Sequence, residues 1–365
     1  MRILLAISTL GAGGAERVIT ILSDELARRG HAVTLLTLAG VDNGFFEVSP
    51  AVRRVALGLA AISQPATTRV VANVKRVLAF RRAVIAANPD VVVAFITETN
   101  VTALLACLGL GKPVVISERI DPREHPVGRI WSLLRRATYG RARLLVVQTS
   151  AIADWCRERW GLRSVATIPN PVLVSAGAKI DDAGTTRPFL LAVGRLDRQK
   201  GFDVLLHAYA LVAAELPDLD LRIAGDGPEA DSLRKQAVDA GLGGRVTFLG
   251  QVRNIPDLMN QAFAFVLPSR YEGFPNVLLE ALASGTATIA ADCRSGPRQI
   301  LGHGQYGVLV PVEDPVALAA GLRRMCSDAD LRDNLRAHAA LAVRPYALET
   351  VVTSWERALA EAVGP

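Results

Sequence analysis

The sequence predicts an α/β protein with two domains, each built on a doubly wound parallel sheet with helices on both faces. Short apolar runs alternate with longer amphipathic stretches along most of the chain, which is typical of parallel sheets with covering helices. A length of 365 residues favours two domains, and half of the residues are apolar, enough for two cores. A small, polar and patternless stretch, residues 172–187, interrupts the alternation, and we interpret it as a linker. We therefore expect domains over 1–171 and 188–345 that face each other across a cleft, and a last helix within 346–365 that packs back on the first domain.

The first domain is expected to begin with a βαβ unit. Arg2–Thr9 is apolar almost throughout, as a buried parallel strand is; Glu16–Arg29 follows as a helix and Ala32–Leu38 as a strand. The loop after the first strand carries three glycines, Gly11, Gly13 and Gly14. Such glycines let the backbone approach a ligand closely, but a tight turn uses them too. Their spacing is not G-x-G-x-x-G, so a dinucleotide fingerprint is not predicted.

The alternation continues through both domains. In the first domain we expect strands at Asp90–Ile96, Pro113–Ser117 and Leu144–Gln148, and helices at Arg69–Ala87, from Thr97 to Cys107, and up to Trp160. In the second we expect strands at Phe189–Val193, Leu219–Ala224, Val246–Leu249, Ala262–Leu267 and Ala287–Ala290. Its helices are expected at Phe202–Glu215, Glu229–Gly241, Asn276–Ser284 and Pro315–Cys326, with a final helix at Leu348–Ala362.

One stretch of the second domain carries the strongest functional signal. Pro268 and Ser269 end an apolar strand, a short loop carries Glu272, and the helix that starts at Asn276 carries Glu280. Ligands of open α/β sheets bind at such strand ends, and the N–H groups of a helix N-terminus favour an anion. Carboxylates accept hydrogen bonds from hydroxyl groups. In a nucleotide sugar, a diphosphate lies between the hydroxyls of the ribose and those of the sugar, so the sequence predicts a site for such a ligand. The alternative is that both glutamates are ordinary solvated charges.

Two basic residues follow an earlier strand of the same domain. Arg195 and Lys200 lie in the glycine-flanked loop after Phe189–Val193. Fixed cations at this edge would stabilise a diphosphate that gains negative charge as its bond to the sugar breaks. A single loop cation is ordinarily a solvated charge, but the joint occurrence of both with Glu272 and Glu280 favours a site.

The charge is distributed unevenly along the chain. Residues 1–180 contain 23 Lys and Arg against 12 Asp and Glu, while residues 181–365 contain 18 against 23. The bases of the first half gather in residues 51–88 and 119–143. The first group contains Arg76, Arg81 and Arg82, and Trp131 lies among the bases of the second group. These bases either face an anionic membrane or a pyrophosphate, or they only keep the domain soluble.

The remaining features exclude several classes of protein. The four cysteines, Cys107, Cys156, Cys293 and Cys326, show no zinc spacing and are typical of reduced cytosolic thiols. No apolar run reaches the ~18 residues of a membrane span. The apolar start fits a strand and glycine loop better than a signal peptide. We therefore expect a cytoplasmic protein.

The motifs resemble those of a known family, the retaining glycosyltransferases of family 4, which have the GT-B fold of two Rossmann-like domains. The resemblance rests on Gly194-Arg195-Leu196 with Lys200-Gly201, on Ala224 to Pro228, on Glu272 with Glu280 eight positions later, and on Gly13 to Arg17. The resemblance implies that Arg195 and Lys200 bind the diphosphate, Glu280 the ribose, and Glu272 the donor sugar. It also implies donor contacts from the loop Gly13-Gly14, from backbone near Phe248, and from Gly273, Phe274 and Asn276.

Two positions depart from the family pattern. Glu118-Arg119 stands where many members have a histidine, and Gln299 stands where a glutamate is common. The stretches Phe95 to Asn100 and Ile116 to Arg119 look most like members that extend lipid-linked glycans. The resemblance therefore implies metal-independent transfer of GalNAc, GlcNAc or galactose from a UDP-sugar, without a cofactor, to a polyprenyl-diphosphate-linked glycan.

The bases of the first domain then suggest docking on the inner face of the plasma membrane. Candidate acceptor or membrane contacts are Arg76, Arg81, Arg82, Glu118, Arg119 and Trp131. No nucleic-acid partner is expected. Two alternatives are a nucleotide-sugar 2-epimerase of the same fold and a non-catalytic, membrane-bound protein that binds sugar nucleotides.

Overall fold

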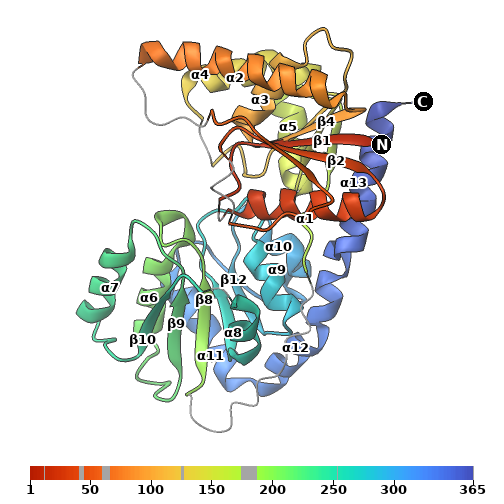
Figure 1. Ribbon diagram of the computed structural model, residues 1–365. Coiled ribbons are helices and arrows are strands. Elements are labelled where there is room, and N and C mark those ends of the chain that lie inside the picture. Colours follow the sequence, from red (N-terminus) through yellow and green to blue (C-terminus); the bar gives the residue numbers. More distant parts are fainter. Residues whose placement is uncertain are drawn as a thin grey trace. The chain divides into compact units, whose positions relative to one another are not determined.

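In the computed structural model the chain forms two compact units, Met1–Pro171 together with Glu349–Pro365, and Val172–Leu348 (Figure 1). The structure describes residues 1–11, 13–40, 45–59, 66–124, 127–173, 187–252 and 254–364. Most of the predicted linker, residues 174–186, lies outside the described residues. Its first residue, Val172, is buried in the core of the second unit, where it forms a parallel bridge with Ala347.

The first unit contains a seven-stranded, wholly parallel sheet with the strand order β3-β2-β1-β4-β5-β6-β7. Its strands are β1 (Arg2–Ile7), β2 (Ala32–Thr37), β3 (Arg53–Ala56), β4 (Val91–Phe95), β5 (Val114–Ser117), β6 (Leu144–Val147) and β7 (Val165–Thr167). The inner strands are apolar because both faces of the sheet are covered.

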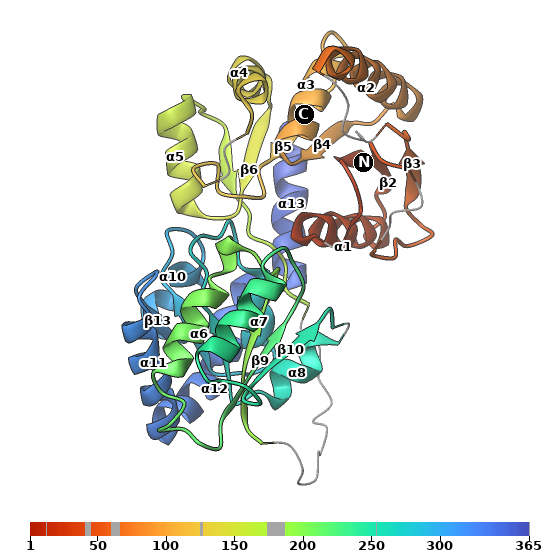
Figure 2. The ribbon, with the colours of Figure 1, turned by 90° about the vertical axis from the view of Figure 1, so that its left-hand side faces the viewer.

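The described residues of this unit form six α-helices: α1 (Gly14–Arg28), α2 (Ala66–Ala87), α3 (Thr97–Ala106), α4 (Arg129–Thr138), α5 (Ser150–Trp160) and α13 (Leu348–Val363). Phe80 of α2, Leu104 of α3 and Ile152 of α5 share one apolar cluster with strand residues. Figure 2 shows α3 between α2 and α4. The last helix, α13, belongs to this unit, because Trp355 is fully buried and stacks on Phe95 with ring centroids 5.8 Å apart.

The second unit contains a six-stranded parallel sheet with the order β10-β9-β8-β11-β12-β13. Its strands are β8 (Phe189–Val193), β9 (Asp220–Ala224), β10 (Val246–Gly250), β11 (Ala264–Leu267), β12 (Thr288–Ala291) and β13 (Val308–Val310). Its helices are α6 (Phe202–Ala210), α7 (Ala230–Asp239), α8 (Ile255–Gln261), α9 (Asn276–Ala283), α10 (Pro297–Ile300), α11 (Pro315–Ser327) and α12 (Ala329–Val343). One apolar cluster lies on each face of this sheet.

These two sheets confirm the predicted α/β class. In each sheet the strand order reverses once, between β1 and β4 in the first unit and between β8 and β11 in the second. Loops at such a reversal diverge and leave room for a ligand beyond the carboxyl ends of the strands. Within the described residues, no helix has the length and apolar character to span a bilayer.

Candidate active site

Two loops meet where the strand order of the second unit reverses. One follows β8 and contains a 3-10 turn, Arg198–Lys200; the other follows β11 and leads into α9. Gln199 links them in both directions: its side-chain amide donates to the Tyr271 carbonyl over 3.0 Å, and its own carbonyl accepts from the Arg270 N–H over 2.8 Å. The loops therefore hold each other in place.

An ion pair lies at this junction. The Nζ atom of Lys200 is 2.7 Å from Oε1 of Glu272, and the Ser269 hydroxyl donates to the same oxygen, also over 2.7 Å. The Lys200 side chain is 18% exposed and the Glu272 side chain 5%. In such a sheltered place the pair is attracted more strongly than at the open surface. The structure thus brings together two of the residues that the sequence singles out.

Close backbone packing at this edge requires glycine. Gly225, directly after β9, has φ +137°, and a Cβ atom there would lie 1.9 Å from the carbonyl oxygen of Gly194. Gly201 has φ +66°, and its Cβ would lie 2.2 Å from the carbonyl oxygen of Pro268. A side chain at Gly225 would push apart the loops after β8 and β9, and a side chain at Gly201 would push apart the loops after β8 and β11.

We expect Gly225→Ala to lower the free energy of unfolding by more than about 2 kcal/mol, because strain and a backbone clash combine. Gly241→Ala is the matched control: Gly241 also has a positive φ, +71°, but nothing lies within 4 Å of its Cβ position. Urea unfolding should therefore show a loss of only about 1 kcal/mol for the control. Equal losses in the two variants would mean that the close approach at Gly225 does not matter.

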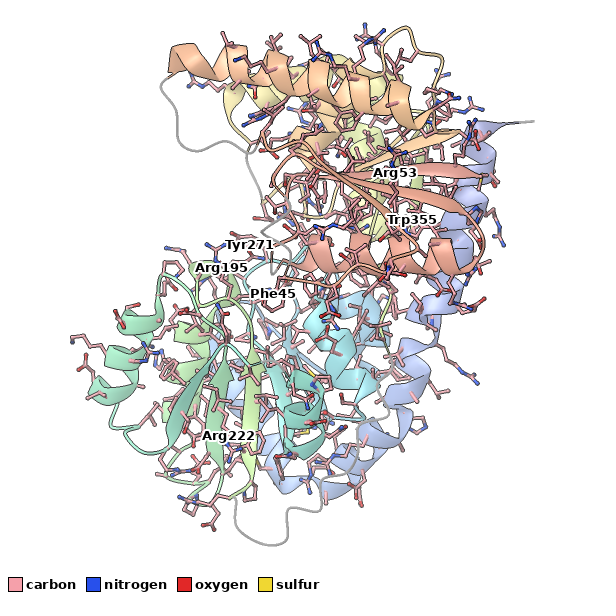
Figure 3. All side chains as sticks on the ribbon, in the orientation of Figure 1. Phe45, Arg53, Arg195, Arg222, Tyr271 and Trp355 are labelled. Carbon is pink, nitrogen blue, oxygen red and sulfur yellow. The ribbon has the colours of Figure 1, made fainter. Side chains whose placement is uncertain are left out.

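Arg195 lies apart from the Lys200–Glu272 pair. Its side chain is 72% exposed, and its ion-pair partner is Asp197, at 3.5 Å. Figure 3 places Arg195 and Tyr271 at the same edge of the second unit. The Arg195 guanidinium therefore keeps most of its hydration, whereas Lys200 is held in place.

The start of α9 contains several predicted donor contacts. Asn276, the first residue of α9, and Glu280 one turn later are half-buried. Phe274 is buried instead, and its ring packs against Tyr346 at 5.7 Å between centroids. Gly273 is buried as well, and its carbonyl accepts a hydrogen bond from Ser295 over 3.1 Å. The Phe274 side chain therefore serves the core, and a donor contact at this position would fall to its backbone.

Phe248 lies in β10, at one edge of the sheet. The pairing of β10 with β9 shifts register between Phe248 and Gly250, and the Arg234 guanidinium lies 5.6 Å from the centroid of the Phe248 ring. The Gly250 carbonyl accepts from the Gly225 N–H over 2.7 Å. This bulge ties the end of β10 to the loop after β9.

In the first unit the glycine loop after β1 leads into α1. Gly13 is the N-cap residue of α1 and Gly14 its first residue. A Cβ atom at Gly13 would lie 2.2 Å from Oε2 of Glu16, whose other oxygen accepts from the Thr9 hydroxyl over 3.3 Å. The glycine therefore makes room for the Glu16 carboxylate at the N-terminus of α1, where the helix dipole stabilises a negative charge.

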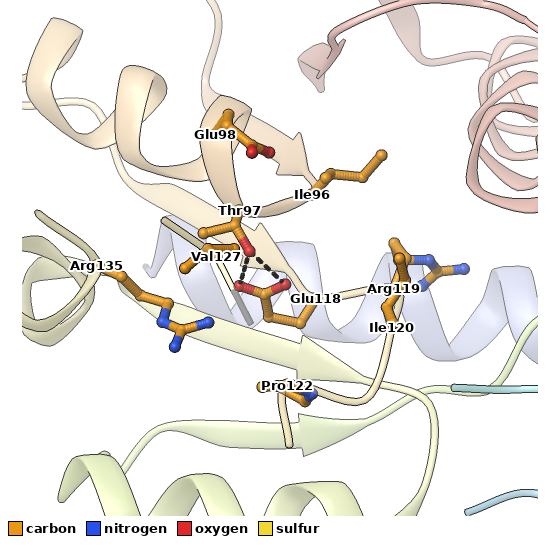
Figure 4. Close-up of a pocket in the computed structure, with 9 residues that line it drawn as sticks. All are labelled: Ile96, Thr97, Glu98, Glu118, Arg119, Ile120, Pro122, Val127 and Arg135. Atoms are coloured by element: carbon orange, nitrogen blue, oxygen red, sulfur yellow. Dashed lines mark hydrogen bonds between the residues drawn. The ribbon is translucent and has the colours of Figure 1, made fainter. Parts of the chain in front are cut away.

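Glu118 and Arg119 follow β5 and are both buried (Figure 4). The Glu118 carboxyl group accepts hydrogen bonds from the hydroxyls of Thr97, over 2.9 and 3.0 Å, and of Tyr139. Burial raises the pKa of Glu118 and lowers the pKa of Arg119 to about 9. The Arg119 guanidinium contacts Ser117, Asn170 and the Phe95 ring, so these two neighbours do not pair with each other.

Two of the predicted membrane bases have structural partners. Arg81 donates to the carbonyls of Ala106 and Leu108, over 2.9 and 2.6 Å, and so satisfies the end of α3. Arg76 donates to the Leu59 carbonyl over 2.8 Å and to Asn73. Arg82 is exposed. Of these three arginines, Arg82 is therefore the best placed to contact a membrane surface.

Trp131 of α4 packs partly against the core of the first unit. The apolar groups that point outward from α4 are instead its neighbours Ile130 and Leu133, which are 71% and 69% exposed. The sequence did not distinguish these orientations, because residues 129–138 were not predicted as a helix.

Sequence reasoning also missed residues that support the site. Arg270, two positions before Glu272, forms two hydrogen bonds with Asp203, over 2.8 and 2.7 Å, and an ion pair with Glu313. These bonds raise the pKa of Arg270 and lower the pKa of Asp203. Ser269 was likewise seen only as the end of a strand. Its position three residues before Glu272 was the one feature of the sequence that could have indicated a role in the site.

Similar proteins identify the family. A family model described as "Glycosyltransferase Family 4" matches residues 12–175, and one described as "Glycosyl transferases group 1" matches residues 178–341. The chain is 28% identical over 362 residues to a Campylobacter jejuni GalNAc-alpha-(1->4)-GalNAc-alpha-(1->3)-diNAcBac-PP-undecaprenol alpha-1,4-N-acetyl-D-galactosaminyltransferase, with 99% of each chain covered. It is 27% identical to a second C. jejuni enzyme, N-acetylgalactosamine-N,N'-diacetylbacillosaminyl-diphospho-undecaprenol 4-alpha-N-acetylgalactosaminyltransferase, with 89% of this chain and 90% of that one covered.

Solved structures agree with the fold. The sucrose-phosphate synthase of Thermosynechococcus elongatus matches with a TM-score of 0.84 and 22% identity, over 98% of each chain. Anabaena HepE in complex with UDP and glucose matches with a TM-score of 0.80 and 20% identity, over 98% of this chain and 99% of that one. The motifs, the two parallel sheets and the two family models agree, and the chain belongs to glycosyltransferase family 4, with the GT-B fold.

Proposed function

We propose that this glycosyltransferase moves a hexose or N-acetylhexosamine, such as GalNAc, GlcNAc or galactose, from a UDP-sugar to a polyprenyl-diphosphate-linked glycan. The observation that carries the proposal is the Lys200–Glu272 pair at the strand-order reversal of the second unit. The pair places a cation, which can bind a phosphate, beside a carboxylate, which can accept hydrogen bonds from sugar hydroxyls. A binding site for a sugar diphosphate needs both groups. The names of the two C. jejuni relatives support a lipid-linked acceptor, and the HepE complex supports UDP.

In the proposed reaction the bond between C1 of the donor sugar and the diphosphate oxygen breaks, and C1 bonds to a hydroxyl oxygen of the acceptor. The hydroxyl proton leaves with the UDP. Lys200 and Arg195 would compensate the charge that develops on the departing diphosphate, which is the electrostatic task that a metal ion performs in other transferases. Glu272 would accept hydrogen bonds from sugar hydroxyls, and Glu280 from the ribose. We therefore propose that no metal or cofactor is needed.

A screen of UDP-sugars with a short polyprenyl-diphosphate glycan, run in EDTA, tests this function through the release of UDP. We expect acceptor-dependent release with at least one donor. A strict requirement for Mg²⁺ or Mn²⁺ would contradict the metal-free site. Conversion of a UDP-sugar to its epimer without acceptor would instead indicate a 2-epimerase. Binding without turnover across the screen would indicate a non-catalytic protein.

We expect the product to retain the anomeric configuration of the donor, giving an α-linkage from a UDP-α-sugar. The physical basis is the placement of charge: the cations of the site would hold the departing diphosphate beside C1, on the face from which it leaves. The coupling constant of the new anomeric proton, measured by NMR on the purified product, checks this expectation. A coupling typical of a β-linkage would contradict it.

We propose further that the first unit docks on the inner leaflet of the plasma membrane through α2 and α4. Val71, Val74, Leu78 and Ile85 recur at helical spacing on α2 and are each half exposed or more. On α4, Ile130 and Leu133 are exposed as well. The exposed bases beside these residues are Lys75, Arg82, Arg129 and Arg136. An apolar stripe with flanking bases is typical of helices that lie in an anionic membrane surface.

Wild-type protein is therefore expected to sediment with anionic vesicles at low salt, to dissociate at high salt and to ignore neutral vesicles. Substituting both Ile130 and Leu133 by serine should weaken binding at least about tenfold, since each inserted side chain contributes about 1.5–3 kcal/mol. The control is Val238→Ser with Val316→Ser, two exposed apolar residues on helices of the second unit. Protein that stays in the supernatant with anionic vesicles at low salt would contradict docking, and the transferase assignment would stand.

A further inference from the structure

The Arg270 side chain joins three separate segments of the second unit. Its guanidinium donates to the Arg198 carbonyl over 2.8 Å, to both carboxylate oxygens of Asp203 over 2.8 and 2.7 Å, and to Glu313 over 2.6 Å. Arg198 begins the 3-10 turn that ends at Lys200. Asp203 lies in the first turn of α6, and Glu313 follows β13. Four hydrogen bonds thus converge on one side chain that is only 14% exposed.

These contacts use the planar fork of the guanidinium. Asp203 accepts through both of its oxygens, which is the two-pronged geometry that fits an arginine to a carboxylate. Nε of Arg270 reaches Glu313, and Nη1 reaches the Arg198 carbonyl as well as Asp203. A lysine ammonium has three donors and no planar fork, so it could not make all of these bonds at once.

The segments that Arg270 joins carry the two members of the buried ion pair. Lys200 is the last residue of the 3-10 turn, two positions after Arg198, and Glu272 lies two positions after Arg270 itself. The Lys200 ammonium ends a flexible four-carbon chain, so the places that it can reach depend on where its backbone is held. A shift of about 1 Å in a positioned group can lower a reaction rate about 10²-fold. A clamp on these two segments therefore bears directly on the site.

The backbone at Glu313 is strained beside this clamp. Glu313 has φ +57°, in the left-handed region that residues other than glycine rarely adopt. Such a conformation persists where the surrounding structure holds it, often near functional sites. In this conformation the Glu313 carboxylate reaches Nε of Arg270, although its side chain is 54% exposed. The segment after β13 is thereby tied to the loops after β8 and β11.

We propose that Arg270 is a positioning residue for the transfer reaction, which fixes the turn that carries Lys200 against the loop that carries Glu272. The inference rests on the proposed function, because it takes Lys200 as a ligand of the donor's diphosphate. Arg270 acts without touching the substrate. Its effect on diphosphate binding therefore passes through Lys200 and disappears when Lys200 is replaced.

Calorimetric titration with UDP tests this dependence in wild type, Arg270→Lys, Lys200→Ala and the double variant. UDP is a suitable probe, because its terminal phosphate carries the negative charge that develops on the departing diphosphate. We expect each single variant to bind UDP at least about fivefold more weakly than wild type. The double variant should bind UDP no more weakly than Lys200→Ala. Losses that multiply in the double variant would show that Arg270 acts independently of Lys200, and they would overturn the inference.

Arg245→Lys is the matched control. Arg245 also makes four hydrogen bonds from a side chain that is 21% exposed, one to Asp220 and three to carbonyls of the chain between α6 and β9. It directly precedes β10, and Asp220 begins β9, so this cluster lies at the amino ends of the strands, away from the site. The control should bind UDP with wild-type affinity. A loss equal to that in Arg270→Lys would mean that breaking any arginine cluster of this unit weakens binding, and the inference would fail.

Hydrogen–deuterium exchange of the ligand-free protein tests the clamp without any substrate. The Lys200 N–H donates to the Asp197 carbonyl over 3.1 Å, so its exchange reports how firmly the turn is held. In Arg270→Lys, residues 197–203 should exchange at least about threefold faster than in wild type, whereas Arg245→Lys should leave them unchanged. Unchanged exchange in Arg270→Lys would overturn the clamp. Wild-type protein that binds no UDP would instead overturn the proposed donor.

Asp203→Asn provides a milder variant in case Arg270→Lys does not fold. It removes only the charge of the two-pronged partner and keeps one acceptor oxygen for Arg270. We expect faster exchange in residues 197–203 and weaker binding of UDP, both in the same direction as for Arg270→Lys. Folded Asp203→Asn with wild-type exchange and wild-type affinity for UDP would contradict the role of Arg270.

Discussion

Lys200→Ala is expected to lower turnover by ~10²-fold or more, because it removes a fixed cation from the place where the departing diphosphate gains charge. The effect should fall on kcat more than on KM, since the contact strengthens in the transition state. Arg195→Ala is expected to cause a loss of the same order in steady-state kinetics with the preferred UDP-sugar. Lys235→Ala is the control, an exposed lysine paired with Asp239 on α7.

The two variants should differ in stability. Lys200→Ala leaves the buried Glu272 carboxylate with Ser269 alone, so the free energy of unfolding should fall by about 1–3 kcal/mol. Arg195 is largely exposed, so its replacement should leave unfolding nearly unchanged. Wild-type-like turnover in both variants would contradict the role of these cations.

Glu272→Gln is expected to lower turnover by at least ~10²-fold, because a neutral amide is a weaker acceptor for sugar hydroxyls and no longer orients Lys200. The same change leaves Lys200 without its ion-pair partner. Kinetics with saturating acceptor would measure the loss.

The double variant Lys200→Met with Glu272→Gln separates chemistry from folding. Both charges of the pair are removed, so no buried charge is left without its partner. The free energy of unfolding should therefore be higher than in either single variant. Its turnover should stay low. Recovery of turnover together with stability would show that the pair only supports the fold.

Sequence patterns predicted the parts of the fold that depend on local periodicity. Apolar runs located the central strands of both sheets, and the end of β11 with the start of α9 placed Glu272 at the carboxyl edge of the sheet. Glycine spacing around Lys200 indicated the neighbouring loop. These features follow from residues close together in the chain, so the sequence alone reveals them.

The contacts that complete the site depend on packing between distant segments. The direct bond between Lys200 and Glu272 requires the close approach of the loops after β8 and β11, which Gly201 permits. The packing of the Phe274 ring against Tyr346 likewise depends on a distant segment, since the two residues lie far apart in the sequence. No periodicity in the sequence encodes such contacts.

The same limit applies to the first unit. Arg81 looked like a free surface base, but it satisfies carbonyl groups at the end of α3. A helix was predicted from Thr97, and its N-cap residue in the structure is Ile96, which has a positive φ of +74°. The hydroxyl of Thr97 bonds to Glu118. Only the folded chain shows which of these polar groups are already satisfied.

The most direct test of the account is the mass of a polyprenyl-diphosphate-linked glycan after incubation with each UDP-sugar. Wild-type protein is predicted to add the mass of one sugar residue and to form UDP in equal amount, while Lys200→Ala does so ~10²-fold more slowly. An acceptor of unchanged mass with every UDP-sugar, from folded protein that binds UDP, would contradict the transfer of sugar to a lipid-linked glycan.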